Sequence, residues 1–152
     1  MVTLLKNAWE GVIDPILRRP DRVQAAALCW RKGKRGKEVL LVTSRDSGRW
    51  ILPKGWPIDG LDGPGTAAQE AWEEAGVRAA KVTPRPVGRY HYVKKLDSGV
   101  PAPVEATVYS VKVARLEDAF PEAAQRRRCW MAPAQAAELV DEPELRDLLR
   151  AF

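Results

Sequence analysis

The sequence predicts a single α/β domain in which helices pack against a mixed β-sheet. The chain has 152 residues, 45% of them hydrophobic, which is enough to bury the core of one domain. Strand-like and helix-like patterns follow one another without the strict alternation that an all-parallel sheet requires. We therefore expect one domain over residues 21–152, preceded by an arm of residues 1–20 that packs on it.

The arm is the least regular part of the pattern. Its apolar residues recur near helical spacing, but Gly11 and Pro15 interrupt them. An irregular or partly helical segment is expected, and its apolar side chains could also pack against a second subunit in a homodimer. The arm lacks the unbroken apolar stretch of a signal peptide, and no window approaches the roughly 20 apolar residues that span a bilayer. A cytoplasmic protein is expected.

Three strands are expected after the arm. Apolar runs at residues 23–30 and 38–44 flank the basic turn 31–37, and this pattern predicts a β-hairpin. Residues 49–53 are a third candidate, which ends at its proline.

A loop and a short helix follow. Residues 55–65 are rich in glycine, proline and aspartate, which predicts irregular structure. Thr66 is the expected N-cap of a helix over residues 67–75. Gly76 stands where a helix end requires a residue that can adopt a positive φ.

The last third of the chain predicts two strands and a broken helix. Residues 87–96 and 102–113 alternate as strands do, and a glycine-containing turn joins them. The basic segment 125–130 is expected to be a loop. A helix is expected to begin near Pro133, to break at residues 141–143, and then to resume.

Three glutamates of the first helix form the clearest candidate site. Glu70, Glu73 and Glu74 stand at i, i+3 and i+4, so they share one helical face. Such a face is commonly just solvated. However, Glu70 and Glu74 repel each other, and no lysine or arginine lies among them. A hard divalent cation such as Mg²⁺ would relieve this repulsion, and it takes oxygen ligands together with substrate phosphates.

The spacing around these glutamates resembles the Nudix box, GX5EX7REUXEEXGU, where U is an aliphatic residue. When the pattern starts at Gly55, the matching positions are Glu70, Glu73, Glu74, Gly76 and Val77. Leu61 replaces the first glutamate of the box, and Gln69 replaces its arginine. The preceding residues 41–57 are similar to the entry of the diphosphoinositol and diadenosine polyphosphate hydrolase type.

This resemblance implies an α/β/α sandwich around a mixed sheet. It also implies hydrolysis of a diphosphate linkage in a nucleoside-diphosphate derivative, a dinucleoside polyphosphate or a diphosphoinositol polyphosphate, with Mg²⁺ or Mn²⁺ as cofactor. By the same resemblance Glu73 and Glu74 are the catalytic metal-binding pair and Glu70 is a further ligand. The backbone carbonyl of Lys54 or Gly55 would complete the metal site. Gln69 can still donate a hydrogen bond to Glu73, without the charge of arginine.

Anionic substrates require cations near the metal. Arg45 and Lys54 match positions that contact phosphates in polyphosphate-cleaving relatives, and Arg22 and Arg127 are weaker candidates. Glu105 could supply a carboxylate from outside the box.

Two other functions remain open. The departures at Leu61 and Gln69 are compatible with a domain that binds a nucleotide or polyphosphate as a sensor without cleaving it. The formal charge of +5 favours an anionic partner, and this includes nucleic acid. A nucleic-acid function is disfavoured, because the basic residues are scattered over turns and no aromatic and basic platform is evident.

Overall fold

The computed structural model describes residues 22–152, so the predicted arm and its possible contact with a second subunit lie outside the described residues. The strands are β1 (Arg22–Gly33), β2 (Gly36–Thr43), β3 (Trp50–Ile51), β4 (Lys54–Gly55), β5 (Val77–Val82), β6 (Gly88–Lys95), β7 (Pro101–Leu116) and β8 (Arg128–Met131). The helices are α2 (Gly63–Ala75), α3 (Pro133–Leu139) and α4 (Pro143–Ala151).

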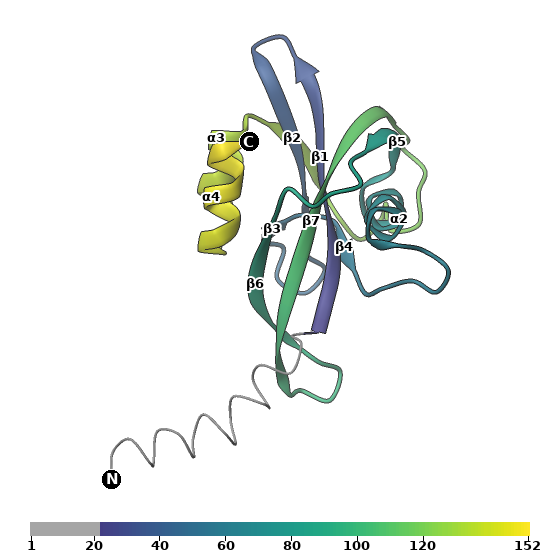
Figure 1. Ribbon diagram of the computed structural model, residues 1–152, viewed down its shortest axis with the longest axis vertical. Helices are drawn as coiled ribbons and strands as arrows, with labels where there is room; N and C mark the ends of the chain where they lie inside the picture. The colour runs from purple at the N-terminus through teal and green to yellow at the C-terminus, as the bar shows by residue number, and fades with distance from the viewer. Residues whose placement is uncertain (1–21) are drawn as a thin grey trace.

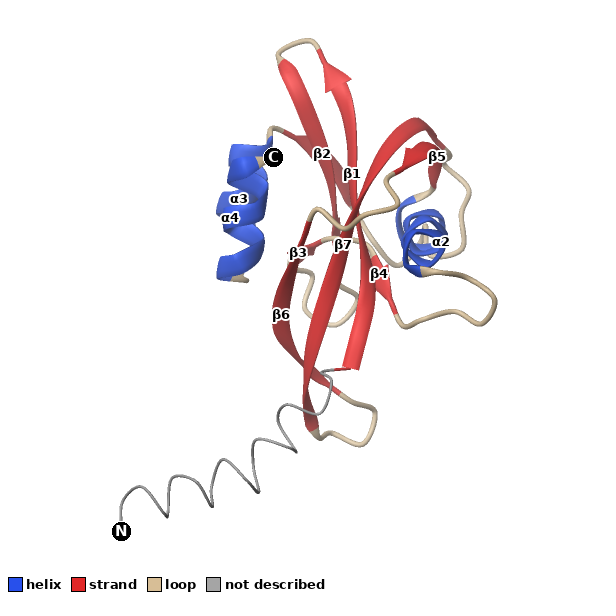
Figure 2. Ribbon diagram, in the orientation of Figure 1, coloured by secondary structure: helices blue, strands red, loops and turns tan. Residues whose placement is uncertain are grey.

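The strands form one mixed sheet with β1 near its centre. The described part of the sheet has the order β3-β2-β1-β7-β5, while β4 pairs with β1, β6 with β7 and β8 with β2. β1 and β7 run parallel, and the other pairs are antiparallel. Helix α2 covers one side of the sheet, and α3 and α4 lie on the other (Figure 1). Figure 2 shows the same helix, sheet and helix layers, so the predicted α/β sandwich is confirmed.

The two faces of β1 supply both halves of the core. Ala26 and Leu28 pack in the cluster that contains α3 and α4, whereas Ala27 and Cys29 pack in the cluster that contains α2. This alternation follows from the two-residue period of a strand. On α2, the small residues that lie flat against the sheet are Ala67, Ala71 and Ala75, all fully buried. Their size lets the helix lie close to the strands, which brings its glutamates near β4.

Both predicted hairpins are present, and β3 lies within the third predicted strand, but β4, β5 and β8 were not predicted as strands. β5 has four exposed residues among its six, so it carries no apolar pattern, and its pairing with β7 is what makes it a strand. β8 overlaps the basic segment 125–130 that was expected to be a loop, and among its residues only Met131 is buried. Pairing with β2 decides its conformation. Pairing in the folded sheet, rather than a local pattern, therefore determines both β5 and β8.

Helix α2 begins four residues before the predicted position, at Gly63. Its N-cap is Asp62, whose side chain accepts a hydrogen bond of 2.8 Å from the backbone N–H of Gly65. The prediction of Thr66 as the cap was wrong, because Pro64 at the start of the helix needs no N–H partner and fixes a helical φ there. The other end is as predicted, since Gly76 adopts a φ of 69°.

The C-terminal helices match the predicted break. α3 starts at Pro133 and α4 starts at Pro143, so each proline takes the first helical position. Within residues 22–152, no helix is long and apolar enough to cross a membrane.

The cap at Asp62 gives a first testable prediction. Replacing Asp62 with alanine should lower the free energy of unfolding by about 1 kcal/mol, because an N–H of the first turn loses its acceptor. The nearby exposed Asp59, changed to alanine, is the matched control and should have little effect. Urea denaturation measures both. Equal stability of the two variants would contradict the role of Asp62 as the cap.

Candidate active site

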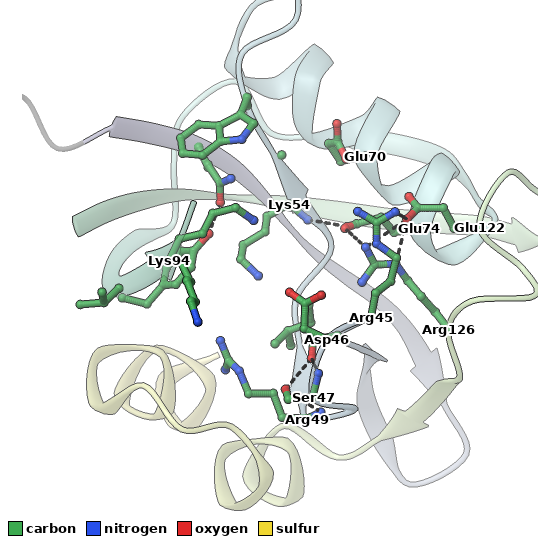
Figure 3. Close-up of a pocket in the computed structure, with 18 of the residues that line it drawn as sticks. Arg45, Asp46, Ser47, Arg49, Lys54, Glu70, Glu74, Lys94, Glu122 and Arg126 are labelled. Atoms are coloured by element: carbon green, nitrogen blue, oxygen red, sulfur yellow. Dashed lines mark hydrogen bonds and ion pairs between the residues drawn. The ribbon is translucent and has the colours of Figure 1, made fainter. Parts of the chain in front are cut away.

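A cavity of about 660 Å³ opens between α2, the segment that follows β2, and β6. Its volume suits a small molecule. Figure 3 shows that charged side chains dominate its walls. Those that line it are Arg45, Asp46, Arg49, Lys54, Glu70, Glu74, Lys94, Lys95, Glu122 and Arg126.

Glu74 is a buried carboxylate at this cavity. Only 4% of the residue is exposed. One carboxylate oxygen accepts the backbone N–H of Lys54 at 3.0 Å, and the other lies 3.0 Å from the guanidinium of Arg126. Burial raises the pKa of Glu74, while Arg126 and the N–H of Lys54 act in the opposite direction by stabilising the charged form. A buried carboxylate with this much compensation is fixed in orientation.

Glu70 lies on the same wall, but no donor or cation within residues 22–152 pairs with its carboxylate. The carboxylate rests against the α-carbon of Gly55, where a methyl group would overlap it. Burial, followed by repulsion from Glu74 and Glu73, raises the pKa of Glu70 to about 7. The site therefore holds one carboxylate in direct contact with a cation, Glu74, and one without such a contact, Glu70, on which Arg126 acts only at a longer distance.

Glu73 differs from its two neighbours in the box. It does not line the cavity, and its carboxylate accepts a hydrogen bond of 3.2 Å from Gln69. This is the bond expected for Gln69. The backbone carbonyl of Glu73 accepts the N–H of Glu122 at 3.0 Å, so this residue also anchors the segment that precedes β8. Leu61, in the other altered box position, is 44% exposed.

The structure adds Glu122 and Arg126, which were not among the predicted site residues. Both come from the segment between β7 and β8, and their side chains are paired at 3.1 Å. Arg126 belongs to the basic segment 125–130, in which the sequence predicts Arg127 as the substrate-binding residue. No local pattern marks Glu122, because it reaches the site only when its segment folds over α2.

Cations line the wall opposite the glutamates. The ammonium of Lys54 lies 5.0 Å from the ring centre of Tyr92, and no carboxylate among the described residues pairs with it. Burial lowers the pKa of Lys54 to about 8. Arg49 and Lys94 are further cations of the cavity, and Arg49 is held by Glu142 at 2.7 Å. Lys54 is thus a buried cation of the cavity whose ammonium is not in direct contact with a carboxylate of the described residues.

Arg45 was predicted and does line the cavity. It is 3.3 Å from Glu122 and donates to Gln125 at 3.2 Å. The other predicted cations lie elsewhere: Arg22 is exposed at the start of β1, and the guanidinium of Arg127 lies over the ring of Trp50. Neither lines the cavity, so their substrate roles stay predictions without geometric support.

Glu105 is also away from the cavity. It pairs with Arg89 at 3.5 Å and lies 3.8 Å from His91. Glu122 takes the place in the cavity wall that was expected for a carboxylate from outside the box.

The cavity offers the type of ligand atom that a divalent cation such as Mg²⁺ prefers. Glu70 and Glu74 offer hard carboxylate oxygens, and the backbone of Lys54 and Gly55 lies beside them. Among the described residues, no three acidic, histidine or cysteine side chains already converge as a ligand set. Arg126 already pairs with one carboxylate oxygen of Glu74 at 3.0 Å.

Comparison with known proteins decides the family. A family model described as the NUDIX domain matches residues 21–152. This chain belongs to the Nudix family. The match covers the whole described domain, including the box on α2 and the cavity beside it.

Curated Nudix relatives are similar in sequence. Nudix hydrolase 21, chloroplastic, of Arabidopsis thaliana is 30% identical over 117 residues, which are 76% of this chain and 56% of the relative. Diphosphoinositol polyphosphate phosphohydrolase 3-alpha of Mus musculus is 38% identical over 55 residues, 36% of this chain and 34% of the relative. The matched segments therefore span about half or less of these relatives.

Solved structures share the fold. A Caenorhabditis elegans Ap4A hydrolase in a binary complex has a TM-score of 0.63 and 24% identity, covering 86% of this chain and 93% of that one. The NUDIX domain of Shewanella oneidensis NrtR, crystallised with ADP ribose, has a TM-score of 0.63 and 16% identity, covering 96% and 97%. At these identities the likeness establishes the fold.

The raised pKa of Glu70 predicts how the metal-free Nudix domain responds to pH. Its pKa in the folded state, about 7, lies above the ordinary value of 4.5. The contribution of Glu70 to the free energy of unfolding is therefore complete below pH 4.5 and is lost as the pH rises through 7. Glu70→Gln should therefore raise the Tm above pH 7 in EDTA, by about 2 °C, because water screens part of the repulsion.

At pH 4 the same variant should match the wild type. Glu138→Gln, on the exposed face of α3, is the control and should not change the Tm at either pH. A Tm of Glu70→Gln below that of the wild type at pH 8 would contradict the prediction.

Proposed function

We propose that this Nudix domain hydrolyses a diphosphate linkage in a small anionic molecule with the help of Mg²⁺ or Mn²⁺. The substrate classes are nucleoside-diphosphate derivatives, dinucleoside polyphosphates and diphosphoinositol polyphosphates. The observation that supports this most directly is the cavity, where uncompensated Glu70 and buried Glu74 face the unpaired ammonium of Lys54. One wall suits a metal ion and the other suits phosphate.

Different residues of the cavity would bind the metal ion and the substrate. Glu70 and Glu74 hold the divalent cation, and the N–H of Lys54 keeps the carboxylate of Glu74 oriented. When bound, such a cation supplies positive charge to phosphoryl oxygens and lowers the pKa of a water molecule. Lys54 and Arg45 bind the substrate phosphates and neutralise part of their charge. Trp56, which is 37% exposed, lines the same cavity and offers an apolar surface to the organic part of the substrate.

A binding function without turnover is the second candidate. The ion pair between Arg126 and Glu74 favours it, because a guanidinium already compensates one of the two carboxylates that would hold the metal. Leu61 and Gln69 in the altered box positions point the same way. In this case the domain would bind a nucleotide or polyphosphate as a sensor.

Activity assays separate the two functions. Phosphate release should be measured with Mg²⁺ and with Mn²⁺ on diadenosine polyphosphates, nucleoside-diphosphate sugars and diphosphoinositol polyphosphates. Glu74→Gln and Glu70→Gln should each lower kcat by at least about 100-fold, because a metal ligand is lost. The exposed Glu138→Gln should keep full activity. Tight binding of these compounds without turnover would favour the sensor and reject the hydrolase.

The same assay tests the catalytic role predicted for Glu73. A loss for Glu73→Gln equal to that of Glu74→Gln would assign Glu73 as a metal ligand. A much smaller decrease in kcat would assign Glu73 a structural role. Its carboxylate would then act by accepting the hydrogen bond from Gln69, and its backbone carbonyl by accepting the N–H of Glu122.

Lys54 gives a separate prediction for substrate binding. Lys54→Met removes the ammonium but leaves the backbone N–H that bonds Glu74, so the KM should rise about tenfold or more while the fold is kept. Steady-state kinetics measures this. Lys81→Met, on exposed β5, is the control of equal charge change. An unchanged KM for Lys54→Met would exclude Lys54 as a phosphate ligand.

A further inference from the structure

Arg126 is the most unusual charged residue of the cavity. Its side chain is 7% exposed, and that of its partner Glu74 is 5% exposed. An arginine buried to this extent is stable only where carboxylates and carbonyls accept its hydrogen bonds. Figure 3 shows Arg126 beside Glu74 and Glu122, the two carboxylates that it contacts.

The bonds of Arg126 are distributed unequally. Nε and Nη2 donate to Glu122 at 3.3 and 3.1 Å, and Nη1 donates to the carbonyl of Thr43 at 3.0 Å. The contact with Glu74 is a single one, from Nη2 at 3.0 Å. The guanidinium therefore stays anchored at Glu122 and Thr43 if the contact with Glu74 is broken.

Glu74 is equally able to exchange this partner. Its second oxygen stays bonded to the N–H of Lys54, so the carboxylate keeps its orientation without Arg126. Glu122 is different, because both Arg126 and Arg45 compensate it. A divalent cation would then bind at Glu74 and the uncompensated Glu70, and would leave Glu122 to the arginines.

We propose that Arg126 is a positioning residue that occupies the metal-facing oxygen of Glu74 in the metal-free protein and yields it to the divalent cation. The inference rests on the proposed metal-dependent function. Arg126 keeps the buried carboxylate of Glu74 charged before the metal binds, and the metal must compete with it. The metal affinity of the wild type is therefore lower than the carboxylates alone would give.

The test is a titration of the full chain with Mn²⁺ in the absence of substrate. The electron paramagnetic resonance signal of free Mn²⁺ measures how much of the metal is bound. Arg126→Gln removes the competing charge and keeps a polar side chain, so it should bind Mn²⁺ at least about tenfold more tightly than the wild type. Arg126→Lys restores the charge and should stay within about threefold of the wild type. Arg127→Gln, one residue away and exposed, is the matched control and should bind as the wild type does.

Thermal melting gives a second readout. Without metal, Arg126→Gln should melt below the wild type because Glu74 loses its compensating charge, and saturating Mn²⁺ should raise its Tm more than that of the wild type. A variant that folds only with Mn²⁺ would also support the exchange. A variant that stays unfolded with Mn²⁺ would overturn it, because the metal would not be replacing the lost charge.

The outcomes also separate this inference from the proposed function. If the wild type binds Mn²⁺ and Arg126→Gln binds with equal or lower affinity, the exchange is wrong and the metal-dependent function stands. If neither the wild type nor Arg126→Gln binds Mn²⁺, the exchange at Glu74 and the metal-dependent function are both wrong. If only Arg126→Gln binds, the exchange holds and the wild-type site is closed to metal, which favours the sensor.

Discussion

The arrangement of the site depends on the buried carboxylate of Glu74. Its two oxygens are bonded to different parts of the chain, one to the backbone N–H of Lys54 on β4 and the other to Arg126 before β8. Helix α2, the sheet and the segment between β7 and β8 therefore meet at a single side chain. An uncompensated charge at this depth would cost several kcal/mol, so the metal-free domain depends on these partners for its stability.

The short strand β4 connects the two chemical walls of the cavity. The backbone of Lys54 faces the glutamates, while its ammonium extends to Tyr92 on the other wall. Gly55 follows directly, and its lack of a side chain makes room for the carboxylate of Glu70. Two consecutive residues thus set the spacing between the glutamates and the ammonium of Lys54.

The departures from the Nudix box change the support of the site and leave the two cavity-lining glutamates in place. Gln69 keeps the bond to Glu73 that the box arginine would make, but adds no positive charge. Positive charge reaches the carboxylates from outside the box instead, through Arg126 and Arg45. The site therefore receives its compensating charge from a different segment of the chain than the family pattern provides.

Local sequence determined those features whose causes are local. Helical spacing placed Glu70 and Glu74 on one face, Gly76 ended the helix because it can adopt a positive φ, and apolar runs predicted the hairpins. The start of α2 was missed, because Thr66 was predicted as the cap and the residue that caps the helix is Asp62, four residues earlier. Tertiary structure alone decided that β5 and β8 are strands and that Glu73 is turned from the cavity. It also brought Glu122 and Arg126 to Glu74, because the segment between β7 and β8 meets α2 only in the folded domain.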